Sequence, residues 1–167
     1  MTPNATKAAL DYIQEIEGDI VNDPDDAGGY TRYGVTQKAW EAYSDEDFET
    51  VDRTKARQFF HDEYIKAPGI HQLPDKLGVM MASLSVNAGP AQAIRTLQRA
   101  AGVEVDGHLG PKTLAAVEKV DAAKLKAEVD KFYEKTAKRG NNKKFLKGWL
   151  RRSREVFERA EAMEDDK

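Results

Sequence analysis

The 167-residue sequence contains no cysteine, which excludes disulfides and thiolate metal sites. Its three histidines, His61, His71 and His108, form no HExxH pattern, so hydrolysis at a zinc site is not indicated. The sequence also lacks a GxSxG nucleophile motif and a phosphate-binding P-loop. Carboxylates, hydroxyls and amides remain as the chemical groups available, and neither a metal nor a cofactor is expected.

Long apolar runs are missing as well. No stretch approaches the roughly 20 apolar residues that cross a membrane, and residues 1–19 lack the basic-then-apolar order of a signal peptide. With 40% hydrophobic and 33% charged residues, the composition is that of an ordinary globular protein, which we expect to be monomeric. The length suits one domain, or one domain with two lobes, and a sizeable core.

The net charge of −3 hides a concentration of basic residues near the C-terminus. A final helix over about 143–159 is expected to have a docking face and a basic face. The docking face holds Phe145, Trp149, Val156 and Phe157, and the basic face holds Lys144, Lys147, Arg151 and Arg154. A basic face can contact an anionic wall or the periphery of a membrane, or it can simply be solvated, and the sequence leaves both readings open.

Helical spacing dominates the chain and predicts a mainly α fold with one small β element. In the first helix, Ala9, Ile13 and Ile16 recur at this spacing, and Glu17 follows Ile13 by four residues, so it shares the apolar face. Gly18 is the expected C-cap. Partial burial would raise the pKa of the Glu17 carboxyl; the alternative is a surface glutamate at a frayed helix end.

A polar loop over 22–29 follows, with Pro24 and a glycine pair setting its turns. It is not a calcium loop, because the fifth and twelfth ligand positions are Ala27 and Gly34. Residues 30–36 have the β-branched and aromatic content of a short strand or hairpin. Thr36 and Asp52 are expected to cap the next two helices.

Near-continuous apolar residues over 73–87 predict a buried central helix. Further helices are expected after Pro90, after Pro111 and over about 122–138, followed by the final helix. The sequence shows no internal repeat.

The stretch from Glu15 to Thr36 contains the candidate catalytic residues. It offers an acid at a helix end, acids on the following loop and hydroxyls beyond it. Glycosidic bonds are cleaved by such a set: one carboxylic acid protonates the leaving oxygen, and a second carboxylate activates water or stabilises charge at the sugar carbon.

This stretch resembles the EGGYVNDPxDxGGxTxxGIT signature of glycoside hydrolase family 108, a family of N-acetylmuramidases found among phage endolysins. The matching residues are Glu17-Gly18, Val21 to Gly29, Thr31 and Gly34 to Thr36. Val86 to Pro90, Leu97 to Ala100 and Gly102 to Pro111 resemble the region usually taken as the family's peptidoglycan-binding part, and Lys147 to Arg152 resemble its C-terminal helix. The family's catalytic glutamate falls on Glu17. The chain departs from the family pattern at Asp19, Ile20 and Ser83, the last standing where an aspartate is common.

The order of residues is also similar to that of phage-type lysozymes, in which eight residues separate a Glu from an Asp and five separate the Asp from a Thr. Here eight residues lie between Glu17 and Asp26, and four between Asp26 and Thr31. The resemblance implies that Asp26 and Thr31 join Glu17 in catalysis, and we expect substrate contacts from Tyr30, Tyr33 and Asn87.

A lysozyme-like two-lobed fold is implied, with a catalytic lobe and central helix over 1–90 and a helical C-terminal lobe over 91–167. The implied function is hydrolysis of the β-1,4 bond between N-acetylmuramic acid and N-acetylglucosamine in peptidoglycan, with no nucleic-acid partner. An endolysin of this kind accumulates in the host cytoplasm and acts at the wall after a membrane lesion. Rival readings are a lytic transglycosylase, a non-catalytic wall-binding module and a secreted antibacterial effector.

Overall fold

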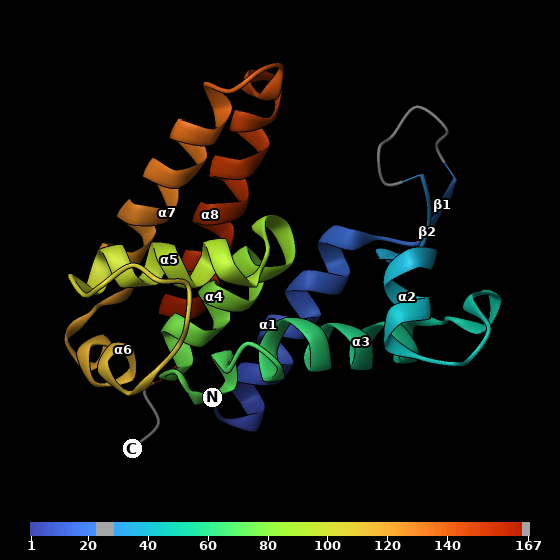
Figure 1. Ribbon diagram of the computed structural model, residues 1–167, viewed down its shortest axis with the longest axis horizontal. Coiled ribbons are helices and arrows are strands. Elements are labelled where there is room, and N and C mark those ends of the chain that lie inside the picture. Colours follow the sequence, from blue (N-terminus) through green and yellow to red (C-terminus); the bar gives the residue numbers. More distant parts are fainter. Residues whose placement is uncertain (23–28, 165–167) are drawn as a thin grey trace.

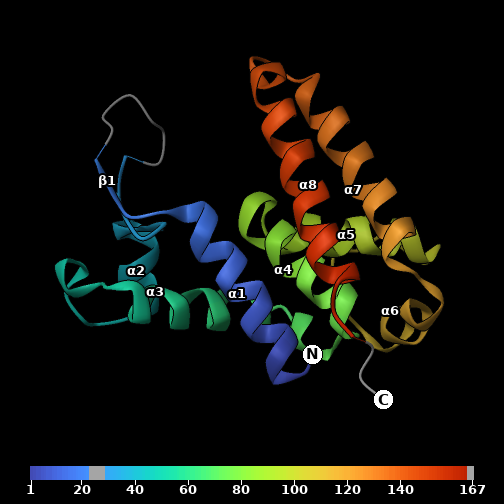
Figure 2. The same cartoon turned by 180° about the vertical axis from the view of Figure 1, so that it is seen from behind.

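A buried helix, α4 (Asp75–Ala88), lies at the centre of the molecule, as the apolar run predicts. Every residue from Leu77 to Ser85 is buried, because α1, α5 and α8 pack around this helix on different sides (Figures 1 and 2). The computed structural model describes residues 1–22 and 29–164.

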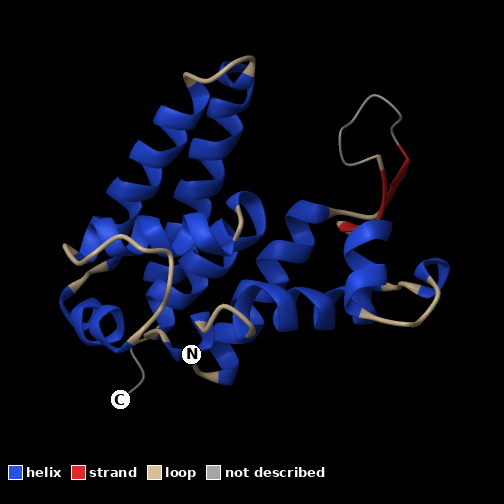
Figure 3. Cartoon of the chain, viewed as in Figure 1, coloured by secondary structure: helices blue, strands red, loops and turns tan. Residues whose placement is uncertain are grey.

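Helices make up most of the described chain, and the strands lie together beside α2 (Figure 3). The α-helices are α1 (Pro3–Glu17), α2 (Gln37–Tyr43), α3 (Arg53–Phe60), α4 (Asp75–Ala88), α5 (Pro90–Ala101), α6 (Pro111–Ala116), α7 (Ala122–Ala137) and α8 (Leu146–Glu161). The strands are β1 (Ile20–Asn22), β2 (Tyr30–Arg32) and β3 (Val35–Thr36). Short helical turns are η1 (Phe48–Thr50), η2 (His61–Lys66), η3 (Ile70–Gln72), η4 (Val117–Lys119) and η5 (Asn142–Phe145).

The sheet follows α1 directly and is antiparallel, in the order β1-β2-β3. Val21 pairs with Thr31, and Thr31 pairs with Thr36 on the other side. Thr36 ends the sheet and caps α2 through a bond from the Ala39 amide to its hydroxyl, and Asp52 caps α3 in the same manner. Both predicted caps are therefore confirmed, as is the small β element after the first helix.

In the second half of the chain, α7 and α8 form a long helical hairpin that projects from the remaining helices (Figures 1 and 2). A buried glutamine on α5, Gln98, holds the loop between α5 and α6. Its carbonyl accepts the amides of Asp106 and Gly107, and its amide donates to the Asp106 carboxylate and to the His108 carbonyl. The turn at Asp106 and Gly107 is thereby fixed to the helix.

The two halves of the chain share one hydrophobic core. The Tyr12 hydroxyl on α1 donates to the Arg152 carbonyl at 3.3 Å and to Glu155 at 3.1 Å, both on α8. The Arg159 guanidinium lies over the Tyr12 ring, 4.7 Å from its centroid. None of the helices in the described residues is both long and apolar enough to span a membrane.

Two local predictions, on Ile16 and Phe145, were wrong. Ile16 is 39% exposed, so burial of the α1 end comes from Ile13 and the opposing elements. Phe145 is 48% exposed and does not dock with Val156; it stacks on Trp149 instead, at 5.8 Å. The helix that Asp52 caps ends as an α-helix at Phe60, because residues 61–66 form a π-helical turn, a wider turn that is common at functional sites.

Candidate active site

Glu17 is the last residue of α1, and the face it shares with Ile13 turns its side chain toward the interior. Gly18 ends the helix with φ 71°, and its amide donates to the Gln14 carbonyl at 3.3 Å. This positive φ suits glycine and lets the chain leave the helix for β1 without covering the carboxyl. The Glu17 side chain keeps 26% of its surface exposed, so it is accessible to a ligand but largely desolvated.

The turn between β2 and β3 lies directly on Glu17. A Cβ atom at Gly34 would stand 2.5 Å from the Glu17 Cβ and 3.1 Å from its Oε2. Gly34 also has φ 87°, and the preceding Tyr33 has φ 53°, a left-handed value that non-glycine residues rarely adopt. Position 34 therefore requires glycine, both for its backbone conformation and for its contact with Glu17. The same contact brings residues 30–36, the segment with the predicted hydroxyl groups, next to the Glu17 carboxyl.

A buried guanidinium from the second half of the chain faces the Glu17 carboxyl. Arg152, on α8, places its Nη1 3.7 Å from the Glu17 Oε1. Its Nε donates to the Ser83 hydroxyl at 3.0 Å and its Nη2 donates to the Ser83 carbonyl at 3.1 Å. These two bonds to α4 fix the plane of the guanidinium, so one charged nitrogen points at the acid.

Burial and a neighbouring charge act on the pKa of Glu17 in opposite directions. Burial raises the pKa of the Glu17 carboxyl, and the charge and hydrogen bonding of Arg152 oppose part of that rise. The net direction is upward, as the position of Glu17 on the helix predicts, and the desolvating groups include the turn at Gly34. A raised pKa of this kind suits a carboxyl that acts as a general acid.

Tyr64, on the π-helical turn, completes the surroundings. Its pKa is raised by burial, by Glu63 and by the charge of Glu17, so its ring lies within electrostatic reach of the acid. Tyr64 is partly buried and packs against the hydrophobic core.

Three other predicted site residues are Thr31, Tyr30 and Asn87. Thr31 is a half-buried residue of β2, the strand that precedes the turn at Tyr33 and Gly34. No hydrogen bond among the described residues joins Thr31 to Glu17. Tyr30 bonds Glu49 at 3.3 Å and accepts from Arg32 at 2.9 Å. The Asn87 amide donates to the Tyr133 hydroxyl at 2.9 Å.

Asp26 lies outside the described residues.

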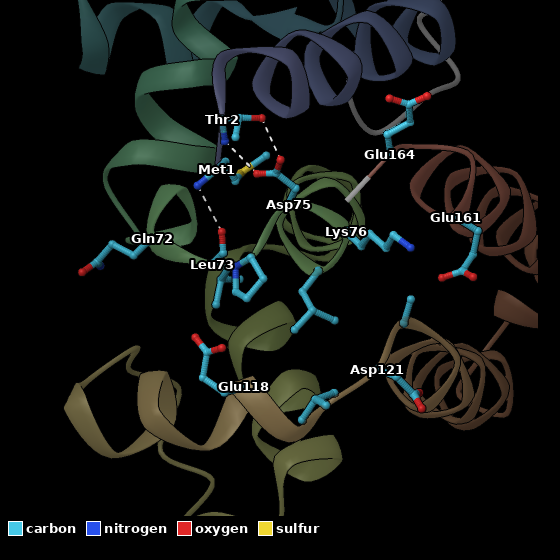
Figure 4. Close-up of a pocket in the computed structure, with 14 residues that line it drawn as sticks. Met1, Thr2, Gln72, Leu73, Asp75, Lys76, Glu118, Asp121, Glu161 and Glu164 are labelled. Carbon is cyan, nitrogen blue, oxygen red and sulfur yellow. Dashed lines mark hydrogen bonds between the residues drawn. The ribbon is translucent and has the colours of Figure 1, made fainter. Parts of the chain in front are cut away.

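A separate cavity of about 840 Å³ lies at the other end of α1 (Figure 4). There Asp75 accepts the amide and the hydroxyl of Thr2, both at 2.7 Å. At 1.5 Å per residue, α1 separates this cavity from Glu17 by about 20 Å. The cavity is therefore not part of the Glu17 site.

Sequence reasoning missed Arg152 and the contact made by Gly34. The sequence marks both residues only as members of motifs, Gly34 within the first signature and Arg152 at the end of the Lys147–Arg152 segment. Their role depends on which segments meet in space.

The chain matches known proteins over both halves. Residues 10–89 match the family model described as glycosyl hydrolase 108, and residues 92–154 match the model described as predicted peptidoglycan domain. The solved structure of Brucella abortus SagA is 30% identical, with 99% of this chain and 98% of that chain covered and a TM-score of 0.85. The comparison with curated proteins gave no significant match.

The sequence signature of this family places its catalytic glutamate at Glu17, and the structure has Glu17 at the end of α1. The helical architecture with its small sheet is lysozyme-like, and the family is one of glycosidases. The chain belongs to glycosyl hydrolase family 108.

Proposed function

We propose that this glycosidase is a muramidase that hydrolyses the β-1,4 bond between N-acetylmuramic acid and N-acetylglucosamine in bacterial peptidoglycan. The observation that supports it best is the Glu17 carboxyl, which is desolvated, has a raised pKa and still reaches the surface. A general acid for glycoside cleavage needs these three properties together.

In the proposed reaction, Glu17 gives its proton to the glycosidic oxygen as the bond to the sugar carbon breaks. The carbon gains oxocarbenium character, and water adds to it from the opposite face, assisted by Asp26 and held by Thr31. The water proton passes to Asp26, and a reducing N-acetylmuramic end is formed. Arg152, 3.7 Å from the carboxyl, stabilises the negative charge that develops on Glu17 during this step.

The stereochemical course depends on the distance between the two carboxyl groups. Inverting enzymes keep them about 6.5–9.5 Å apart, which leaves room for the water, and retaining enzymes about 5–5.5 Å apart. Eight residues separate Glu17 from Asp26, enough for the wider gap. We therefore expect inversion, and a β-anomer as the first product by NMR would contradict it.

Substrate contacts are proposed for Tyr30, Tyr33 and Asn87. Tyr33 has the strongest support, because it belongs to the turn that lies on Glu17. The Tyr30 hydroxyl and the Asn87 amide already have protein partners, so they would contact sugar through their remaining surface or by exchanging those bonds.

Mass spectrometry of digested sacculi tests the reaction. Reducing N-acetylmuramic ends are expected, and the Glu17→Gln variant should leave the sacculi uncut. Products with 1,6-anhydro ends would identify a lytic transglycosylase instead. Sacculi that are bound but not cut by the wild-type protein would identify a non-catalytic module.

For the biological role, we propose an endolysin that accumulates in a host cytoplasm and reaches the wall through a membrane lesion. Expression in the bacterial cytoplasm should then leave cells intact until the inner membrane is permeabilised, and lysis should follow at once. Lysis without permeabilisation would contradict this route. A neighbouring immunity gene would favour a secreted antibacterial effector.

A further inference from the structure

A basic groove of about 530 Å³ lies between α5 and α7. We call it the α5–α7 groove. The two helices pack against each other, and α5 crosses the lower part of α7 (Figure 1). Its charged lining consists of five cations and one carboxylate: Arg95, Arg99, Lys131, Lys135, Arg139 and Glu128. The charge sum is five minus one, a net +4 in a protein whose overall charge is −3.

The cations form two rows. Arg95 and Arg99 are four residues apart on α5, and Lys131 and Lys135 are four apart on α7, a spacing that places each pair on one helix face about 6 Å apart along the axis. Tyr133 lies between the two lysines in sequence and therefore faces the opposite way, where it stacks on Trp149 of α8 at 5.4 Å. The α5–α7 groove is thus on the face of α7 that turns away from α8 and Glu17.

Little of this positive charge is neutralised. Within the described residues, Lys131 pairs with Glu128 at 3.4 Å, and no carboxylate lies within ion-pair distance of the four other cations of the groove. The Arg95 guanidinium instead packs on the turn at Gly107, where a Cβ atom would lie 3.3 Å from its Nε. Unneutralised like charges repel one another, and a bound anion relieves that repulsion.

The basic face of α8 is different. The pocket that contains Lys147, Arg151 and Arg154 also contains Lys126, Asp130 and Glu134, so its four cations and two carboxylates give a net +2. Asp130 is paired with Lys126 at 2.6 Å, and Arg154 is 4.0 Å from Glu158. The acids offset much of the positive charge there, so the α5–α7 groove is the stronger anion site of the two.

We propose that the α5–α7 groove binds the stem peptides of peptidoglycan through their free carboxylates. The proposal rests on the proposed function and adds a second wall-binding site outside the Glu17 region. Guanidinium forks match carboxylates in shape as well as charge. The half-buried Phe132 ring and the 41%-exposed Val105 add apolar surface for methyl side chains of a peptide. All lining residues fall within the 92–154 match to the predicted peptidoglycan domain.

Binding to purified sacculi tests the proposal, in a Glu17→Gln background so that the wall stays intact. The groove variant Arg99→Gln/Lys135→Gln/Arg139→Gln removes three exposed charges. The control Lys147→Gln/Arg151→Gln/Arg154→Gln removes three exposed charges from α8. At low salt the groove variant should bind about tenfold more weakly, the combined size of three exposed ion pairs, and the control much less so. High salt should reduce the difference.

The nature of the anion is tested with sacculi whose carboxyl groups have been amidated with a carbodiimide. Binding of the Glu17→Gln protein should fall to the level of the groove variant, and unchanged binding would overturn the proposal. Equal losses in the two triple variants would also overturn it, since net charge alone would then explain the effect. A groove variant that loses affinity for phosphatidylglycerol vesicles or duplex DNA, but keeps sacculi, would reassign the groove to a phosphate-bearing partner.

The proposed function is tested apart from the groove by cleavage of short soluble muropeptide oligomers, with Glu17 intact. The groove variant should cleave them at the wild-type rate while clearing intact sacculi more slowly. If the wild-type protein cleaves neither substrate, the proposed function fails, and the binding comparison still decides whether the groove holds the wall.

Discussion

Replacing Arg152 should shift the pH range over which the enzyme works. In the folded protein the Arg152 charge lowers the pKa of Glu17 against the larger effect of burial. Arg152→Met removes that charge and keeps an unbranched side chain that suits the surrounding apolar groups, Met80 and Val156 among them. The pKa of Glu17 should rise further, so the acid should stay protonated to a higher pH.

The size of the shift follows from the geometry. Two unit charges about 4 Å apart attract each other by about 4 kcal/mol at an effective dielectric constant of about 20, an upper limit here because the Glu17 side chain is 26% exposed. Charges at this distance usually change a carboxyl pKa by about 1–3 units. We expect the basic limb of the kcat/KM profile to move up by about one pH unit. The maximum rate should fall by up to about tenfold, because a weaker acid transfers its proton less readily.

The assay is kcat/KM on a soluble muropeptide oligomer between about pH 4 and 9, since this profile reports the free enzyme. Arg152→Lys serves as the control: it keeps the charge, so its basic limb should stay near that of the wild type even though its bonds to Ser83 change. Circular dichroism confirms that both variants fold. A basic limb that stays in place or moves to lower pH in Arg152→Met would refute the electrostatic role.

Three further predictions follow from the site. Glu17→Gln should lower activity by at least about a hundredfold. Because the pKa of Glu17 is raised in the fold, its ionised form destabilises the protein, and the neutral amide should have a higher melting temperature than the wild type near pH 8. This difference in melting temperature should disappear below the ordinary glutamate pKa. Gly34→Ala should cost about 1–3 kcal/mol more in denaturant unfolding than Gly29→Ala, since both have positive φ but only Gly34 touches Glu17; equal losses would deny the contact. Asp26→Asn should lose far more turnover per degree of melting temperature than Asp25→Asn, and equal turnover losses would remove Asp26 from the mechanism.

The first helix shows how much of the site local sequence determines. The four-residue step from Ile13 to Glu17 and the glycine that follows left two alternatives, a desolvated acid with a raised pKa and a surface glutamate at a frayed helix end, and the structure supports the first. Caps at Thr36 and Asp52 and the small sheet were predictable for the same reason: each depends on residues a few positions apart.

Contacts between distant segments were not predictable in this way. Helical periodicity marks Arg152 as one more basic residue of a charged helix, and nothing in its neighbourhood shows that it is buried against Ser83 and Glu17. Ile16 illustrates the converse error. Its spacing matches the apolar face, yet its side chain is 39% exposed, because spacing does not show which positions a neighbouring element covers.

The contacts at Glu17 also bear on how the two matched regions relate. Glu17 and Ser83 lie in the glycosyl hydrolase match, and Arg152 lies in the predicted peptidoglycan match. Arg152 is nearly buried, and a buried guanidinium without its partners is costly, so its two bonds to Ser83 connect the second region to the first. Tyr133 and Asn87 make a second such connection. We infer that the C-terminal lobe is part of the catalytic unit, because it supplies the charge that faces the acid, and that its outer α5–α7 face is the part left free to hold the wall.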